Sequence, residues 1–274
     1  MAWWISNEYA GGQLTSVFEE MMKLAGPAGP TALIFGDWGE TNSTPFPVDI
    51  LTGNADRLSG LRALFIADIE SEQCEISWIQ HGDITPVLTA FPNLRKLRVR
   101  GSDGLALSPV RHENLRDLVL ESGGLPAPVV QAVGESDLPA LEHLELWLGV
   151  EEYGGGASVD DLARILSGRS LPALNRLGLC NAENADEIAA AVASAPVVAR
   201  LTELDLSMGT LGDVGAEALM AGQPLTHLKR LVLNHHFMSS EVAHRLVDDL
   251  PAVAVDVEDP QDEEEWGRYT AVNE

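Results

Sequence analysis

Three cationic side chains alternate with apolar residues at Lys96, Arg98 and Arg100, in a chain of 274 residues that holds only 17 Lys plus Arg. Alternate residues of a strand point to the same face, so a strand here would present three positive charges together. Such cations can bind a carboxylate or a phosphate, and a large aromatic residue nearby can anchor a partner. We therefore predict a binding patch made of Lys96, Arg98, Arg100, Glu121, Glu145 and Trp147.

The same residues allow a second interpretation. Asp117, Glu121 and Glu145 belong to the segments that follow the cationic one, and would face it across neighbouring strands. Opposite charges in this arrangement form a ladder of ion pairs that neutralises itself and contributes little to binding or stability. The sequence leaves both interpretations open.

Residue groups typical of catalysis or metal binding are weak. His235, His236 and His244 could hold a metal, but adjacent histidines tend to point apart and no carboxylate follows at ligand spacing. Cys180 falls at an outward strand position but has no base beside it in the sequence. The chain has no Gly-x-Ser-x-Gly, no phosphate-binding loop and no His-Glu-x-x-His. We expect a protein that is not an enzyme and needs no metal or cofactor.

Charge narrows the class of partner. The formal net charge is −25 at pH 7. A chain this acidic is repelled by phosphate backbones and anionic lipids, so nucleic acid and membrane partners are disfavoured, while a basic protein partner is permitted. The two cysteines lie far apart, and the first nine residues lack the pattern of a signal peptide. These features predict a cytoplasmic protein.

A repeated pattern, Leu-x-x-Leu-x-Leu or a close variant of it, must position these side chains. Its successive copies begin 33, 21, 26, 33, 27 and 27 residues apart, which is the period of a solenoid. Apolar pairs four residues apart, such as Ile188/Val192, indicate a helix after the strand. The copies begin at Leu61, Leu94, Leu115, Leu141, Leu174, Leu201 and Leu228.

The pattern resembles the leucine-rich repeat family in its longer form, like that of ribonuclease inhibitor, and residues 201–219 carry the resemblance most clearly. The resemblance implies an α/β fold, a curved leucine-rich repeat solenoid with parallel strands on the concave face and helices on the convex face. The Trp-Trp-Ile-Ser opening and the run at 147–155 are also similar to an uncharacterised actinobacterial leucine-rich-repeat family. That family implies no activity.

Three segments follow from these patterns. Residues 1–30 are predicted to be an N-terminal cap, with a helix over 13–25 and an aromatic cluster of Trp3, Trp4, Ile5 and Tyr9. Residues 31–257 form the solenoid, and residues 258–274 form an acidic C-terminal tail. Acidic runs of this kind usually stay solvated.

The function predicted is binding of a protein or peptide through the concave face. Two alternatives remain: an enzyme or enzyme subunit with a site between the cap and the inserted loops, and an inhibitor of a basic nuclease or toxin. The last rests on analogy at the level of the fold alone. The sequence does not indicate an oligomeric state.

Overall fold

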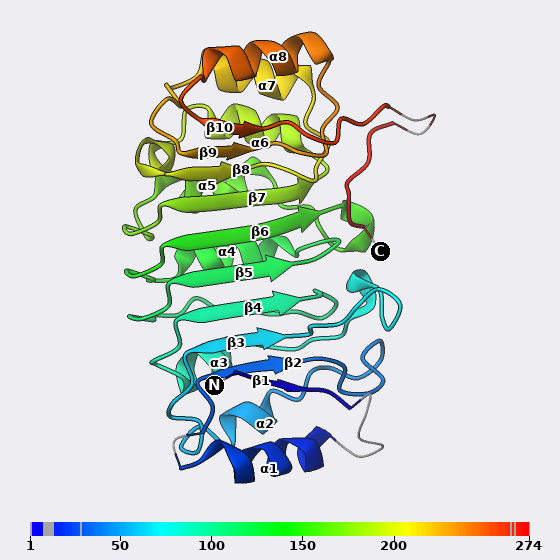
Figure 1. Ribbon diagram of the computed structural model, residues 1–274, viewed down its shortest axis with the longest axis vertical. Helices are drawn as coiled ribbons and strands as arrows, with labels where there is room; N and C mark the ends of the chain where they lie inside the picture. The colour runs from blue at the N-terminus through cyan, green and yellow to red at the C-terminus, as the bar shows by residue number, and fades with distance from the viewer. Residues whose placement is uncertain (1, 8–13, 28, 264, 266, 274) are drawn as a thin grey trace.

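The computed structural model describes residues 2–7, 14–27, 29–263, 265 and 267–273. In these residues the strands form one sheet of 10 parallel strands, in which every strand lies beside its neighbours in the sequence (Figure 1). The sheet is therefore built by simple repetition, without crossovers. Its strands are β1 (Ala2–Ile5), β2 (Ala32–Phe35), β3 (Ala63–Ile66), β4 (Lys96–Arg100), β5 (Asp117–Glu121), β6 (His143–Gly149), β7 (Arg176–Ala182), β8 (Glu203–Asp205), β9 (Arg230–Val232) and β10 (Ala254–Asp256).

The repeated leucines hold the strands in register. Leu64 pairs with Leu97 on the next strand, and the same row continues one leucine per strand to Leu231. These side chains are no more than 2% exposed and point away from the outward positions between them. Because each leucine packs between two neighbouring repeats, no repeat could bury its own apolar side alone.

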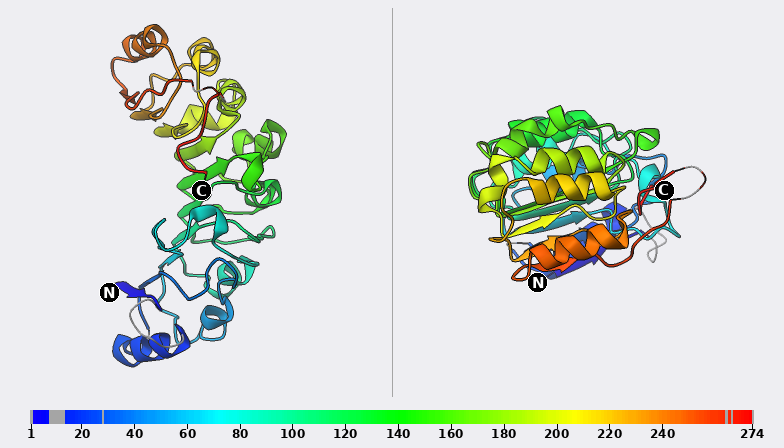
Figure 2. Two further views of the ribbon diagram at one scale, coloured as in Figure 1. Left: turned by 90° about the vertical axis from the view of Figure 1, so that its right-hand side faces the viewer. Right: turned by 90° about the horizontal axis from the view of Figure 1, so that it is seen from above.

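Helices or irregular turns return the chain from each strand to the next. Figure 2 shows the molecule curved, with the strands along the inner side and the helices along the outer side. The fold is the predicted α/β leucine-rich repeat solenoid. Its helices are α1 (Leu14–Ala25), α2 (Asp49–Thr52), α3 (Thr85–Ala90), α4 (Ala127–Glu135), α5 (Val159–Ser167), α6 (Ala185–Val192), α7 (Asp213–Ala221) and α8 (Ser240–Asp249), and its 3-10 turns are Ile76–Trp78, Glu151–Tyr153 and Pro196–Arg200.

The N-terminal segment adds a strand to the end of the sheet as well as the predicted helix. The helix predicted over 13–25 is present as α1, which buries Phe18, Met21 and Met22. Trp3 and Trp4, which we expected to cluster beside that helix, instead form β1 and extend the sheet next to β2. The sheet thus begins before the boundary predicted at residue 31. Tyr9 lies outside the described residues.

The C-terminal tail returns along the edge of the sheet where the strands end, as Figure 2 shows. Asn181 holds it through both polar atoms of its side chain: its amide nitrogen donates to the carbonyl of Val272, and its carbonyl oxygen accepts from the Val272 N–H at 2.9 Å. Ser77 donates to the carbonyl of Asn273 at 2.6 Å. The end of the tail is therefore docked on the repeats.

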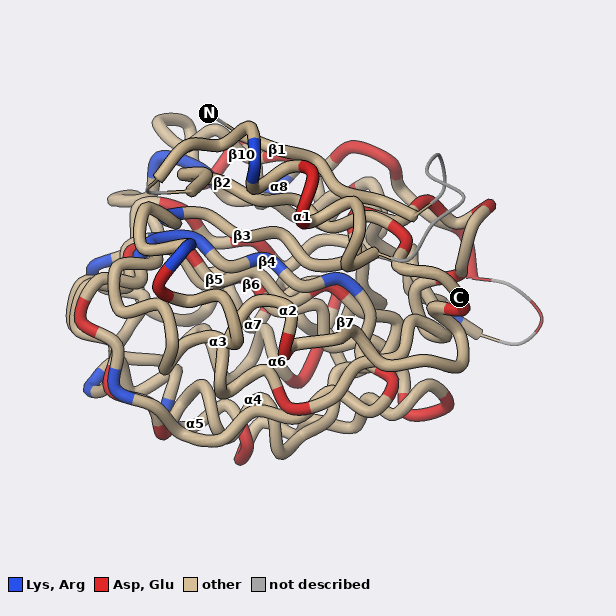
Figure 3. The backbone as a smooth tube through the Cα atoms, turned by 90° about the horizontal axis from the view of Figure 1, so that it is seen from below, with Lys and Arg blue, Asp and Glu red and all other residues tan. Residues whose placement is uncertain are grey.

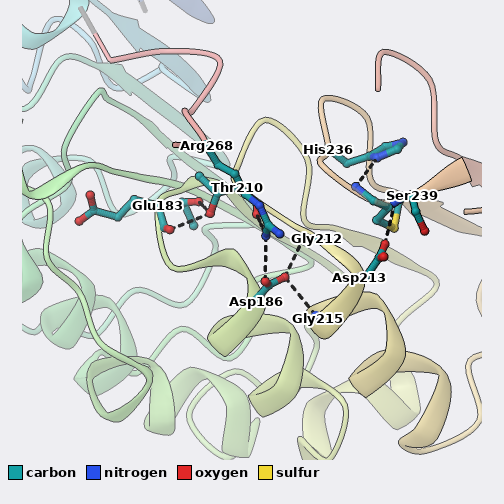
Figure 4. Close-up of polar contacts among 11 residues, drawn as sticks. Glu183, Asp186, Thr210, Gly212, Asp213, Gly215, His236, Ser239 and Arg268 are labelled. Atoms are coloured by element: carbon teal, nitrogen blue, oxygen red, sulfur yellow. Dashed lines mark hydrogen bonds and ion pairs between the residues drawn. The ribbon is translucent and has the colours of Figure 1, made fainter. Parts of the chain in front are cut away.

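Carboxylates at the start of two helices connect neighbouring repeats (Figure 4). Asp186 of α6 accepts hydrogen bonds from the backbone N–H groups of Gly212 (2.7 Å) and Gly215 (3.0 Å) at the start of α7. Asp213 of α7 accepts from the N–H of Ser239, next to α8. Backbone N–H groups at the start of a helix lack hydrogen-bond acceptors within that helix. Each carboxylate therefore acts as an acceptor for the neighbouring repeat.

Within the part of the chain that the structure describes, every helix is too short or too polar to cross a lipid bilayer.

Candidate functional site

The predicted cations belong to β4, and Figure 3 shows positions of both signs of charge among the strands of this part of the sheet. The side chain of Lys96 is 66% exposed, and its ammonium lies 3.7 Å from the Asp117 carboxylate. Arg98 is 45% exposed. Its guanidinium lies over the ring of Phe65, 4.7 Å from the centroid, which orients it by a cation–π contact. Lys96 and Arg98 are therefore accessible to a partner.

Glu121 does not belong to the accessible surface, although we predicted it as a contact residue. Its side chain is fully buried and forms ion pairs with Arg98 and, at 2.8 Å, with the Nε of Arg100. Arg100 also donates to the carbonyl of Ile69 at 2.9 Å. Glu121 and Arg100 are thus engaged at the ends of β4 and β5, and Glu121 holds the guanidinium of Arg98.

Glu145 and Trp147 are both half-buried on β6. The indole nitrogen of Trp147 donates to Glu145 at 2.8 Å. This bond along one strand uses the polar atom of Trp147 and leaves its ring partly exposed. Glu145 lines the same hollow as Lys96 and Arg98, but it is already engaged by Trp147 and His143.

His143 was not among the predicted contact residues, but it lies between two carboxylates of this surface. Its two ring nitrogens lie 3.4 Å from Asp117 and 3.5 Å from Glu145. Burial alone would lower the pKa of His143, but the two carboxylates outweigh burial and raise it to about 9. His143 is therefore a cation at neutral pH. The signal in the sequence was its position, two residues before Glu145 at an outward place of the repeat.

The contact with His143 also shifts the pKa values of its two carboxylate partners. Burial raises the pKa of Asp117 and of Glu145, but His143 outweighs it in each case and holds both values below the ordinary range. All three groups are charged at pH 7, so they form a fixed ion triplet. A protonated imidazole held in this way cannot accept a proton as a general base.

Cys180 lies on β7, in register with Trp147 of β6, and is 1% exposed. Burial, followed by the nearby Asp205 and Glu145 carboxylates, raises the pKa of its thiol well above the ordinary value. A thiol that stays protonated is a poor nucleophile. These contacts favour a structural role for Cys180.

The three histidines considered as metal ligands each contact a backbone carbonyl instead. The ring nitrogens lie 3.2 Å from Tyr269 O for His235, 3.0 Å from Val257 O for His236 and 2.6 Å from Ser240 O for His244. Among the described residues, no group of three or more His, Cys, Asp or Glu side chains is arranged to hold a metal ion.

A hollow of about 430 Å³ opens on the concave face over β2 to β6. One wall is apolar and comes from β2 and β3, while the other carries both signs of charge and comes from β4 to β6. Its outward-pointing lining consists of Ala32, Ile34, Ala63, Phe65, Lys96, Arg98, Asp117, Val119, His143 and Glu145.

Comparison with solved structures supports the fold. The chain is similar to a Bacteroides fragilis protein of known crystal structure, with 29% sequence identity and a TM-score of 0.89 over 98% of this chain and 76% of that one. An internalin from Listeria monocytogenes matches at 14% identity and a TM-score of 0.40, over 88% of this chain and 72% of that one. No protein-family model and no curated protein matches.

Proposed function

We propose that the chain is a binding module, not an enzyme, which holds a protein or peptide partner on its concave face. The observation that carries this proposal is the hollow over β2 to β6, where exposed Lys96 and Arg98 stand beside the half-buried ring of Phe65. An apolar surface with a few placed charges is typical of recognition sites. The leucine-rich repeat fold adds support because its sheet offers a long, preformed surface.

Two physical facts weigh against catalysis at this place. His143 is held as a cation and the Cys180 thiol is buried and protonated, so neither the usual base nor the usual nucleophile is ready to react. The same groups serve well as fixed charges. The proposal also includes the resemblance to an actinobacterial family. It includes a cytoplasmic location as well, with which the two free thiols are compatible.

Capture of partners from an extract of the native host tests this function. Arg98→Glu should reduce capture at least about tenfold, because a charge reversal at an accessible site of a charged interface costs more than about 1.4 kcal/mol. Because Arg98 also pairs with the buried Glu121, the comparison uses protein that thermal melts show to be folded. Arg164→Glu is the matched control: Arg164 is 68% exposed on α5, on the convex side. Equal capture by wild type, Arg98→Glu and Arg164→Glu would place the binding surface elsewhere.

A further inference from the structure

The concave face has two chemically different parts. In β1 to β3, every outward position of a strand carries a small or apolar residue. In β4, which follows directly, the same two rows hold Lys96 and Arg98, paired in register with Ala63 and Phe65. The apolar part consists of Ala2, Trp4, Ala32, Ile34, Ala63 and Phe65, all of them exposed or half-buried.

The hollow lies across the boundary between the two parts. Its apolar wall includes Ala32, Ile34 and Phe65, and its first charged residues are Lys96 and Arg98. A ligand that filled it would have to be apolar at one end and anionic a few ångströms away. A volume of about 430 Å³ suits the last one or two residues of a peptide, within the usual range for ligand sites.

The charges in the hollow favour an anion at the β4 end. Four cations, Lys96, Arg98, Arg100 and the protonated His143, oppose three carboxylates, Asp117, Glu121 and Glu145, so this spot is positive in a chain whose net charge is −25. Of the cations that line the hollow, Lys96 is the least engaged by other groups of the chain, since its carboxylate contact is long at 3.7 Å. It can turn to a ligand without leaving a buried charge unpaired.

We propose that this hollow binds the C-terminal end of an extended partner peptide whose last residue is apolar. The last side chain lies on Ala32, Ile34 and Phe65, and the terminal carboxylate pairs with Lys96 and Arg98. The carboxylates of Asp117 and Glu145 favour a peptide over a fatty acid of the same shape, because only the peptide brings N–H donors to them. This inference rests on the proposed function and specifies its ligand.

Two labelled pools of hexapeptides provide the test. Both are randomised at the first five positions and end in Leu, one with a free carboxylate and the other with a C-terminal amide, and binding to the full chain is followed by fluorescence anisotropy. The carboxylate pool should bind at least about tenfold more tightly, the size expected for a charge-assisted pair. Equal binding of the two pools, or binding of neither, would overturn the inference.

Variants locate the site. Lys96→Met should remove the preference for the carboxylate, whereas Lys229→Met, at an exposed residue just before β9, should keep it. Ala63→Trp should weaken both pools because it fills the apolar wall from an outward position. Thermal melts verify that each variant is folded. Retention of the full preference by Lys96→Met would overturn the site assignment, and displacement of the peptides by equimolar decanoate would overturn the choice of a peptide.

The peptide test and the host-protein capture test together separate a wrong C-terminal ligand from a wrong binding function. Loss of host-protein capture in Arg98→Glu with no binding of either pool would refute only the C-terminal ligand. Unchanged capture in Arg98→Glu would refute both.

Discussion

At the scale of single residues, several histidines link segments that are distant in the sequence through hydrogen bonds to the backbone. Each of five histidines places a ring nitrogen 2.7–3.2 Å from a backbone carbonyl that is 19–34 residues away in the sequence. His236 also accepts a hydrogen bond from the N–H of Met238 at 3.1 Å, which holds the turn after β9. The five are His81, His112, His227, His235 and His236.

His143 leads to a prediction about pH. Its pKa is about 9 in the folded protein and about 6.5 when unfolded, so its ion pairs stabilise the fold fully below pH 6.5. That contribution is lost as the pH rises through 9. His143→Gln should therefore be less stable than wild type at pH 6, and the difference should shrink by pH 10. Urea melts at the two pH values measure it, and a constant difference would contradict the raised pKa.

The pKa of His81 is shifted in the opposite direction from that of His143. Burial lowers its pKa to about 4, so it folds as a neutral ring bonded to the carbonyl of Arg100. The stability that depends on this neutral form is present above pH 6.5 and is lost as the pH falls through 4. His81→Gln, which keeps a polar group but does not titrate there, should lose less stability than wild type between pH 6.5 and 4. Parallel losses in urea melts would show that other groups govern acid unfolding.

At the scale of elements, each strand carries two sets of side chains with different energetic roles. Leu204 of β8 is completely buried between β7 and β9, while Glu203 is half-buried on the opposite face, 3.8 Å from Arg230. Leu204→Ala should lower the free energy of unfolding by about 2–5 kcal/mol because it leaves a cavity between repeats. Glu203→Ala should change it by no more than about 0.5 kcal/mol. Denaturant melts that gave equal losses would contradict the orientation of the strand.

Asp205 shows where alternation along a strand is not enough to predict energetics. It alternates with Leu204 as an outward residue, which by itself predicts a negligible loss on removal. Its carboxylate accepts a hydrogen bond from the N–H of Ser207 at 2.9 Å, and burial raises its pKa. Asp205 is therefore part of the turn after β8, and its removal would leave the N–H of Ser207 without this acceptor.

The attachment of the C-terminal tail to the repeats depends on the small size of Gly123. A methyl group at Gly123 would collide with the hydroxyl of Ser77 and the carbonyl of Asn273. Gly123→Ala should displace the end of the tail and increase tryptic cleavage after Arg268 by several-fold. Gly82→Ala is the matched control, since a methyl group there meets open space. Identical cleavage rates for the two variants would show that the tail is not held at this point.

At the scale of the whole molecule, the sequence predicts what repeats and misses what does not. The leucine period predicted β3 to β9. The first strand was missed because Ala2–Ile5 contains no leucine to show the period. The exposed cations were predicted because alternation sets direction. The burial of Glu121 and the pairing of His143 depend on distances between strands, which the order of residues does not give.

The net charge of −25 also acts on the whole molecule, because like charges along one solenoid repel each other and favour the unfolded chain. Salt screens this repulsion, with a Debye length that falls from roughly 30 Å at 0.01 M to about 8 Å at 0.15 M. Raising NaCl from about 0.01 to 0.15 M at pH 7.5 should therefore raise the melting temperature, even though the same salt weakens the exposed ion pairs, since those contribute little individually. At pH 5, nearer the sequence pI of about 4.4, the gain should be smaller because less charge remains to be screened. Differential scanning calorimetry under the four conditions makes the comparison, and a fall in melting temperature with salt at pH 7.5 would mean that the ion pairs outweigh the net repulsion.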